Sequence, residues 1–278
     1  MGGGMKRKNE KTKKWIFLIG TACVLFLAGL SIMLYPILAN WLYNYDVQAQ
    51  KRNFEQQVED AQFVKDAENF ENSEAIEESL QEECACEGPF DELYQELKRR
   101  NDLLYIEHQK DLKDPFSYEQ PGIDLTEYGL DGNTIGFLSI PKMEIELPIL
   151  LGANSENMRE GAVHLTETSY PIGGNNTNCV LAAHRGYSKA AMFRDIEVLE
   201  LGDTIYIENP WETLIYQVVE IRIISPTDVQ ELLIQPGRDL VTLITCHPYR
   251  VNNQRYVVYC ERVVEDRTIL SFSKLFSS

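Results

Sequence analysis

The second half of the chain contains a series of short runs rich in β-branched and other apolar residues, separated by residues that form turns. Seven such runs lie at residues 136–140, 145–150, 179–183, 204–207, 214–219, 239–244 and 256–259. Many short strands at close spacing are typical of a β-barrel or a β-sandwich. The pattern therefore predicts a mainly β domain, to which we assign residues 132–270.

Three residues with catalytic potential stand at the ends of these runs. His184 follows the run at 179–183, Cys246 ends the segment that starts at residue 239, and Arg255 directly precedes the run at 256–259. Strand ends are places where a rigid scaffold can hold side chains toward one cleft. A cysteine with a histidine can transfer an acyl group through a thioester, and an arginine, which is always charged, can stabilise the oxyanion.

The sequence around these residues resembles that of a known family. Residues 242–255 are similar to the signature of sortases, the membrane-anchored cysteine transpeptidases of Gram-positive bacteria. The similarity covers about residues 132–264 and includes these upstream positions: His164-Leu165, Thr168-Ser169, Pro171, Gly173-Gly174 and His184-Arg185-Gly186. The resemblance implies the sortase fold, a closed β-barrel of about eight strands, with short helices near residues 156–158 and 192–193.

The resemblance also implies a role for each of the three residues. Cys246 would be the nucleophile, and a nearby imidazolium and guanidinium would favour its thiolate. His184 would protonate the leaving amine and then take a proton from the incoming amine. Arg255 would orient the substrate and stabilise the oxyanion. The alternatives are a buried strand cysteine at 246 and a surface arginine at 255 that pairs with a glutamate such as Glu261.

Other residues near the proposed site offer further alternatives. His247 follows Cys246 directly, but adjacent strand residues point to opposite faces, so we expect His247 to face away from the cysteine. Most sortases carry Ser or Thr at that position. Arg185 and Arg250 could line the cleft, although neither matches the catalytic position of the family. We expect His164 to be structural.

A turn-rich loop at residues 111–131 contains the tripeptide Asp114-Pro115-Phe116. Class C sortases, which polymerise pilins, carry a lid motif at this place before the catalytic domain. The resemblance implies that Asp114 pairs with Arg255 and that Phe116 lies on Cys246. The alternative is an Asp-Pro turn followed by a phenylalanine in a small satellite core.

The N-terminal part of the chain has the charge pattern of a membrane anchor. Six lysine and arginine residues lie within residues 1–14, and residues 15–39 contain no charged residue. At about 1.5 Å per helical residue, the uncharged run exceeds the roughly 30 Å hydrocarbon core of a bilayer. The lysines predict a cytoplasmic tail at 1–14, a single-pass anchor in the cell membrane and an extracellular catalytic domain. The alternative is a cleaved signal peptide, but the run is long for one and no clear cleavage site precedes Trp41.

The segments between the anchor and the barrel differ in composition. Residues 40–92 are strongly acidic with sparse apolar positions, and we expect a solvated, partly helical stalk. We expect an amphipathic helix and the lid loop over residues 93–131, and a tail at 271–278. Class C sortases usually also carry a C-terminal membrane segment. Residues 269–278 are too short to span a membrane, so the chain departs from that pattern.

Charge and cysteine content narrow the classes of ligand. The net charge of −17 argues against nucleic acid as a partner. The six cysteines show no recognisable disulfide framework, and Cys84-Ala85-Cys86 is too tight for an ordinary zinc pair. Cysteine transpeptidation requires no metal, and we expect no cofactor.

Together these features predict a class C-like sortase that cleaves a Leu-Pro-x-Thr-Gly-type sorting signal through a thioacyl intermediate. Its partners would be pilins or surface proteins with a C-terminal sorting signal, and the acceptor would be a pilin lysine. One alternative is a housekeeping sortase that uses a peptidoglycan-precursor amine. A second is a non-catalytic, membrane-tethered β-barrel that binds peptides, against which the complete Cys-His-Arg set argues.

Overall fold

The computed structural model describes residues 4–73, 90–110, 112, 114, 120–186 and 190–263. The chain divides into two compact units, with the boundary in helix α1 (Gly4–Ser73) between Tyr45 and Asp46. The first unit holds the N-terminal part of that helix. The second holds the rest of the helix and the β domain.

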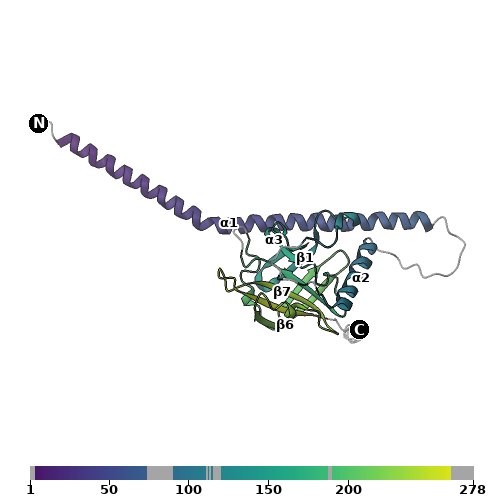
Figure 1. The fold of residues 1–278 in the computed structure, drawn as a ribbon. Coiled ribbons are helices and arrows are strands. Elements are labelled where there is room, and N and C mark those ends of the chain that lie inside the picture. Colours follow the sequence, from purple (N-terminus) through teal and green to yellow (C-terminus); the bar gives the residue numbers. More distant parts are fainter. Residues whose placement is uncertain are drawn as a thin grey trace, which may run out of the picture. The chain divides into compact units, whose positions relative to one another are not determined.

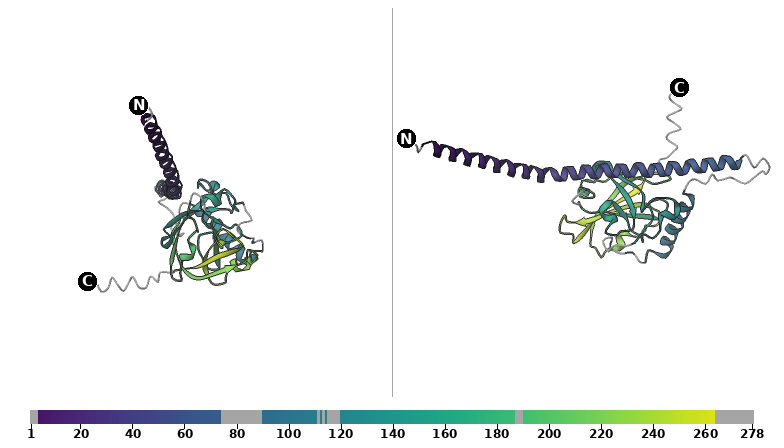
Figure 2. Two further views of the ribbon diagram at one scale, coloured as in Figure 1. Left: turned by 90° about the vertical axis from the view of Figure 1, so that its left-hand side faces the viewer. Right: turned by 90° about the horizontal axis from the view of Figure 1, so that it is seen from above.

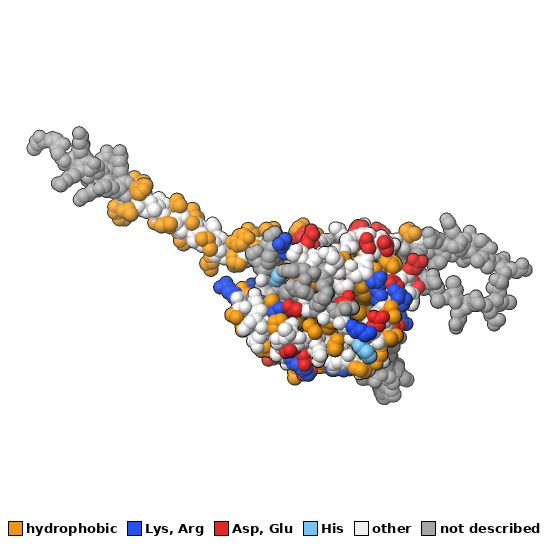
Figure 3. All heavy atoms as spheres, viewed as in Figure 1, with side chains coloured by type: hydrophobic (Ala, Val, Ile, Leu, Met, Phe, Trp, Pro, Cys, Tyr) orange, Lys and Arg blue, Asp and Glu red, His pale blue; other side chains and the backbone are white. Residues whose placement is uncertain are grey.

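In the first unit, apolar side chains line the face of α1 that is seen in Figure 3, and many large apolar residues between Trp15 and Tyr45 are exposed. From Trp15 onward the helix is long and apolar enough to cross a membrane, and none of the most apolar stretch is buried in the protein. Two of its polar side chains bond within the helix. The hydroxyls of Thr21 and Ser31 donate to the carbonyl oxygens of Phe17 and Leu27, at 2.9 and 2.8 Å. Such back-bonding is what a hydrocarbon surrounding demands.

The second unit is a closed β-barrel of eight strands (Figures 1 and 2). The strands are β1 (Thr134–Ile140), β2 (Ile145–Leu151), β3 (Ala162–His164), β4 (Thr177–Ala182), β5 (Thr204–Glu208), β6 (Thr213–Ile224), β7 (Asp239–His247) and β8 (Gln254–Arg262). They close in the order β1-β2-β3-β4-β7-β8-β6-β5. The β2–β3 and β4–β7 pairs are parallel and the others are antiparallel. The predicted fold class is thus confirmed.

Short helices lie in the connections between strands. The helix α3 (Asn157–Glu160) lies where a short helix was expected. Residues 192–193 instead form a turn that leads into the 3-10 helix η4 (Ile196–Val198). Three further 3-10 helices are η2 (Leu125–Tyr128), η3 (Pro141–Met143) and η5 (Val229–Leu232).

Helix α2 (Asp91–Glu107) packs on the barrel through Leu93 and Leu97, which are fully buried. Its Asn101 is also buried, and the Oδ1 of that residue accepts a hydrogen bond of 2.8 Å from the backbone N–H of Tyr170. This confirms an amphipathic helix before the loop at 111–131. The helix therefore places the start of the loop at a defined point on the barrel.

The part of α1 that begins at Asp46 differs from the solvated stalk expected for residues 40–92. Val47 and Phe54 are buried, and the ring of Phe54 meets that of Phe137 on β1 edge-on, with centroids 5.6 Å apart. The ammonium group of Lys51 lies 2.7 Å from carboxylates of both Glu146 on β2 and Glu208 on β5. This part of the helix consequently lies along one side of the barrel (Figures 1 and 2). The three contacting residues, Val47, Lys51 and Phe54, are too few to stand out in the sequence of this acidic segment.

Candidate active site

Cys246 and Arg255 are direct neighbours across the β7–β8 ladder. The two strands are antiparallel, and their register places Cys246 opposite Arg255. Residues that are directly opposite in such a pair project from the same face of the sheet. Cys246 is half-buried and Arg255 is buried. The geometry therefore brings a thiol and a guanidinium together at one end of the barrel.

His184 reaches the same end of the barrel from the other side of β7. The β4–β7 pair is parallel with Ala182 opposite Ile244. Beyond the strand, the N–H of Ala183 donates to the Ile244 carbonyl, and the hydroxyl of Thr245 donates to the Ala183 carbonyl at 2.7 Å. The pairing thus continues one residue further and brings His184 level with Cys246. Of the three predicted site residues, His184 lies just after β4, Cys246 lies on β7 and Arg255 lies on β8, and these three strands are consecutive in the barrel.

Burial and nearby charges act on both titratable groups. Burial raises the pKa of the Cys246 thiol, Arg255 and Arg185 lower it, and Asp114 raises it. Burial lowers the pKa of the His184 imidazole, and Arg159 lowers it further. Both shifts favour the neutral thiol and the neutral imidazole. The reactive thiolate is therefore a minor species in this arrangement.

Asp114 forms a bidentate ion pair with Arg255. Its Oδ1 lies 3.0 Å from Nε of the arginine, and its Oδ2 lies 2.8 Å from Nη2. Such a fork-to-fork contact is the strongest type of carboxylate–guanidinium pair. This is the contact that the resemblance implies, and it occupies the guanidinium edge. Pro115 and Phe116, the other two residues of the expected lid, lie outside the described residues.

Two residues that the sequence analysis did not single out anchor the chain just before Asp114. The side chain of Gln109 donates to the Glu167 carbonyl at 3.0 Å and accepts from the Ile234 N–H. Leu112 is buried in an apolar cluster together with Met158 and Ile244. The apolar residue two positions before the Asp-Pro pair was the available sequence signal. Further along the loop, the Gln120 carbonyl accepts a hydrogen bond of 2.8 Å from the hydroxyl of Thr166.

The structure bears on two expectations from the sequence: a surface Arg255 paired with Glu261, and a structural His164. Glu261 binds Arg238 in two hydrogen bonds of 3.0 and 2.9 Å, whereas Arg255 binds Asp114. His164 is fully buried, and its Nε2 lies 3.0 and 3.1 Å from the carbonyl oxygens of Thr168 and Ser169, as expected for a structural residue.

His247 lies on the other face of β7 from Cys246. The strand continues through this residue, so adjacent side chains alternate. Its ring packs against Tyr256, the neighbour of Arg255, with centroids 5.7 Å apart. Its Nδ1 lies 2.6 Å from Nη1 of Arg185. Arg250, on the turn after β7, has its guanidinium over the ring of Tyr249.

Two further cysteines of the barrel that the structure describes are buried away from this site. Cys179 and Cys260 are buried free thiols, and burial raises the pKa of each far above its usual range. A deeply buried thiol of raised pKa is unreactive. Cys84 and Cys86 lie outside the described residues.

The sortase domain family matches residues 138–263, which include all three site residues. Sortase A of Bacillus anthracis is 32% identical over 182 residues, covering 61% of this chain and 83% of the relative. The chain belongs to the sortase family. The sortase is a cysteine transpeptidase, and sortases act on surface proteins that carry sorting signals.

Solved structures of pilus sortases share the fold. Sortase C1 of Group B Streptococcus pilus island 1 is 29% identical with a TM-score of 0.61, covering 78% of this sortase and 98% of that chain. Sortase C-1 from Streptococcus pneumoniae is 32% identical with a TM-score of 0.56, covering 70% and 96%. This sortase is therefore most like class C.

Proposed function

We propose that this sortase is a membrane-anchored pilus transpeptidase in which Cys246, His184 and Arg255 carry the chemistry and the segment around Asp114 is a lid. The observation that carries the proposal is the bidentate pair of Asp114 with Arg255, directly opposite Cys246. An acidic side chain on that guanidinium is what a class C-type lid would supply. The similarity to pilus sortases supports the same assignment.

In the first half-reaction, the Cys246 thiolate attacks the threonine carbonyl carbon of a Leu-Pro-x-Thr-Gly signal. The carbonyl oxygen becomes an oxyanion, which the Arg255 guanidinium stabilises. The carbon–nitrogen bond to glycine then breaks, and the imidazolium of His184 gives its proton to the leaving amine. The products are a thioester on Cys246 and a neutral His184.

In the second half-reaction, an acceptor amine attacks the thioester carbonyl. His184 takes a proton from this amine, the new amide bond forms, and the carbon–sulfur bond breaks to release the thiolate. For a pilus enzyme the acceptor is a lysine side chain of another pilin. The result is an isopeptide bond between subunits.

The lid blocks this cycle by two contacts. Asp114 holds the guanidinium that the oxyanion needs, and the family motif implies a second contact, of Phe116 with the cysteine. Both must leave before substrate enters, so the lid reduces the fraction of open enzyme. The apolar part of α1 anchors the enzyme, with the lysine-rich tail in the cytoplasm and the barrel outside.

The similarity to sortase A of Bacillus anthracis supports a second candidate, attachment of surface proteins to the cell wall. The acceptor decides between the two. We would incubate the full chain in detergent micelles with a labelled sorting-signal peptide and with equal amounts of a lysine-bearing pilin domain and a peptidoglycan-precursor peptide. Mass spectrometry of the products should show the isopeptide to lysine. A product joined only to the precursor amine would overturn the pilus assignment.

A further inference from the structure

A buried charged group lies behind the proposed site, on the face of β7 and β8 opposite to Cys246 and Arg255. Arg185 directly follows His184 in the chain and is only 8% exposed. Its Nη1 lies 2.6 Å from Nδ1 of His247, and its Nη2 lies 2.6 Å from Oε1 of Glu197 on η4. The guanidinium carbon is 5.9 Å from the centroid of the Tyr256 ring.

Packing alone gives no reason for an arginine here. Within the described ranges, the Nε of Arg185 is buried with no hydrogen-bond partner. Burying a charge and leaving a donor unmatched both cost free energy, and an apolar side chain of similar size is often no less stable in such a place. The guanidinium group of Arg185 is therefore more easily explained by the two residues that it holds in place, His247 and Glu197.

Arg185 and His247 are each adjacent in the chain to a residue of the proposed site. Arg185 is one peptide bond from His184, and His247 is one peptide bond from Cys246. The Arg185–His247 contact thus ties the residue after the proposed acid to the residue after the proposed nucleophile. On the other side of His184, Ala183 is held by backbone and hydroxyl contacts to β7. His184 is consequently held to β7 from both sides.

We propose that Arg185 is a positioning residue for transpeptidation, which holds His184 level with Cys246 through its contacts with His247 and Glu197. The inference rests on the proposed function of the site. It needs a neutral His247: arginine offers only donors, so Nδ1 must accept and the ring proton sits on Nε2. Glu197 Oε1, at 3.2 Å from the same Nδ1, would bind it only if the ring were protonated there.

The charge of Arg185 has a second effect that can be separated from its geometry. Arg185 lowers the pKa of the Cys246 thiol. Lysine at position 185 would keep the positive charge but would lose the planar fork that bonds two partners at once. Alanine would lose both. At position 247, asparagine offers an acceptor near the place of Nδ1, whereas alanine offers none.

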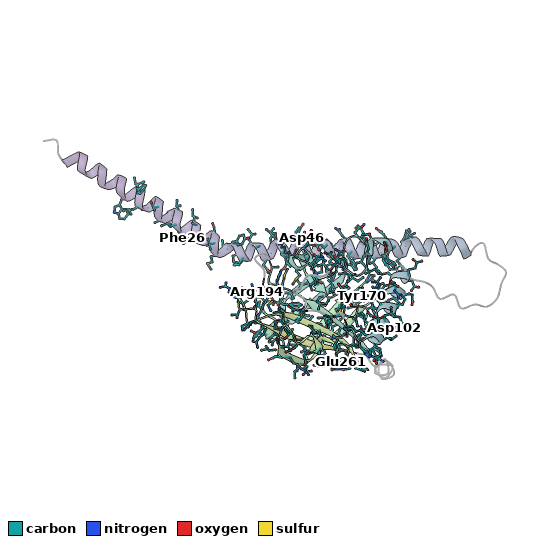
Figure 4. All side chains as sticks on the ribbon, viewed as in Figure 1. Phe26, Asp46, Asp102, Tyr170, Arg194 and Glu261 are labelled. Atoms are coloured by element: carbon teal, nitrogen blue, oxygen red, sulfur yellow. The ribbon has the colours of Figure 1, made fainter. Side chains whose placement is uncertain are left out.

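The test uses the full chain in detergent micelles with Asp114→Ala throughout, so that lid opening does not limit the rate. The variants are Arg185→Lys, Arg185→Ala, His247→Asn and His247→Ala. The charge-matched control is Arg194→Ala, because Arg194 (Figure 4) is exposed and forms an ion pair with its chain neighbour Asp195. We would measure kcat and KM for cleavage of a sorting-signal peptide. Alkylation of Cys246 by iodoacetamide would be followed against pH on the tryptic peptide 239–250, which contains no other cysteine.

Arg185→Lys should lower kcat about tenfold to a hundredfold with little change in KM, because the acid is misplaced while the substrate site is intact. Its alkylation profile should match the parent. Arg185→Ala should lower kcat as much and also move the alkylation profile to higher pH. His247→Asn should retain most of the kcat that His247→Ala loses, and Arg194→Ala should match the parent in both measurements.

The outcomes separate this inference from the function it rests on. A parent that does not cleave the peptide refutes the proposed function and this inference with it. An active parent whose Arg185 variants match it in kcat refutes this inference alone. The same holds if the lost activity follows the folded fraction, measured by thermal unfolding, because Arg185 would then be merely structural.

Discussion

Cys246 and Arg255 occupy opposing positions in one antiparallel strand pair, so a group that binds the arginine also acts on the cysteine. Asp114 is such a group: it pairs with the guanidinium and raises the pKa of the thiol. One carboxylate therefore both occupies the proposed oxyanion donor and raises the pKa of the proposed nucleophile. The following predictions use this relationship.

The lid should slow the reaction of Cys246 with small reagents. Asp114→Ala removes a negative charge beside the thiol and frees Arg255, so the pKa of Cys246 should fall and its alkylation at neutral pH should be faster than in the parent. Asp114→Ala with Phe116→Ala should be faster still and should cleave a free sorting-signal peptide better. Asp102→Ala, which removes one carboxylate from the exposed side of α2 (Figure 4), serves as the control. A double variant that reacts no faster than the parent would make the segment an ordinary surface turn.

His184 and Arg255 should matter more to turnover than His247. His184→Ala removes the proposed general acid and base, for which a loss of about 10²–10⁴ in kcat is typical. Arg255→Ala removes the proposed oxyanion donor, at a cost of about 10²–10³ in kcat. His247→Ala should lose only about tenfold, since it acts through Arg185. Peptide cleavage by the three variants, each with Asp114→Ala, gives the comparison. Equal damage from His247→Ala and His184→Ala would overturn the assignment of the acid.

The docked part of α1 should stabilise the barrel. Phe54→Ala deletes a ring packed against Phe137 and should lower the free energy of unfolding by about 3 kcal/mol. Phe63→Ala is the matched control, because Phe63 is 76% exposed on the same helix. Denaturant unfolding of the full chain in micelles measures both. If the two variants unfold alike, the helix contributes nothing to the barrel.

His164 should make stability depend on pH. Burial lowers the pKa of His164 to about 4, below the ordinary value of 6.5. The unfolded chain therefore takes up a proton that the folded protein excludes as the pH falls from 6.5 to 4. The contribution of the buried His164 to the free energy of unfolding is complete above pH 6.5. It falls by about 3 kcal/mol in total as the pH falls from 6.5 to 4. His164→Gln should flatten the decline in the free energy of unfolding, whereas His108→Asn, at an exposed helix cap, should leave it unchanged. An unchanged slope in His164→Gln would contradict the assignment.

The strand pattern predicted a mainly β barrel or sandwich because most strands are long enough to show it, and the family resemblance implied the closed barrel. β3 was missed, since its three residues pair in parallel with β2 and carry no period of their own. The docking of α1 was missed because Val47, Lys51 and Phe54 are too few to stand out in an acidic segment. The pairing of Asp114 with Arg255 came from family resemblance, because no local rule links residues so far apart in the chain.

The contact of Arg185 with His247 and Glu197 behind the site could not be predicted from the sequence for a different reason. The alternation of side chains along a strand was sufficient to predict that His247 faces away from Cys246. The contact of His247 with Arg185 depends on how β4 and β7 pair, because this pairing places the segment that follows β4 beside the end of β7. Such contacts depend on which strands are neighbours in the barrel, and the sequence alone does not specify the order of the strands.

The central claim is that Cys246 carries the acyl group. The most direct measurement is mass spectrometry of the tryptic peptide 239–250 after brief reaction of the Asp114→Ala enzyme with a sorting-signal peptide at low pH, where the thioester survives. The account predicts the mass of the peptide acyl fragment, ending at threonine, on Cys246, its removal by an added amine, and neither adduct nor cleavage in Cys246→Ala. Cleavage that persists in Cys246→Ala, or an adduct on another residue, would contradict it.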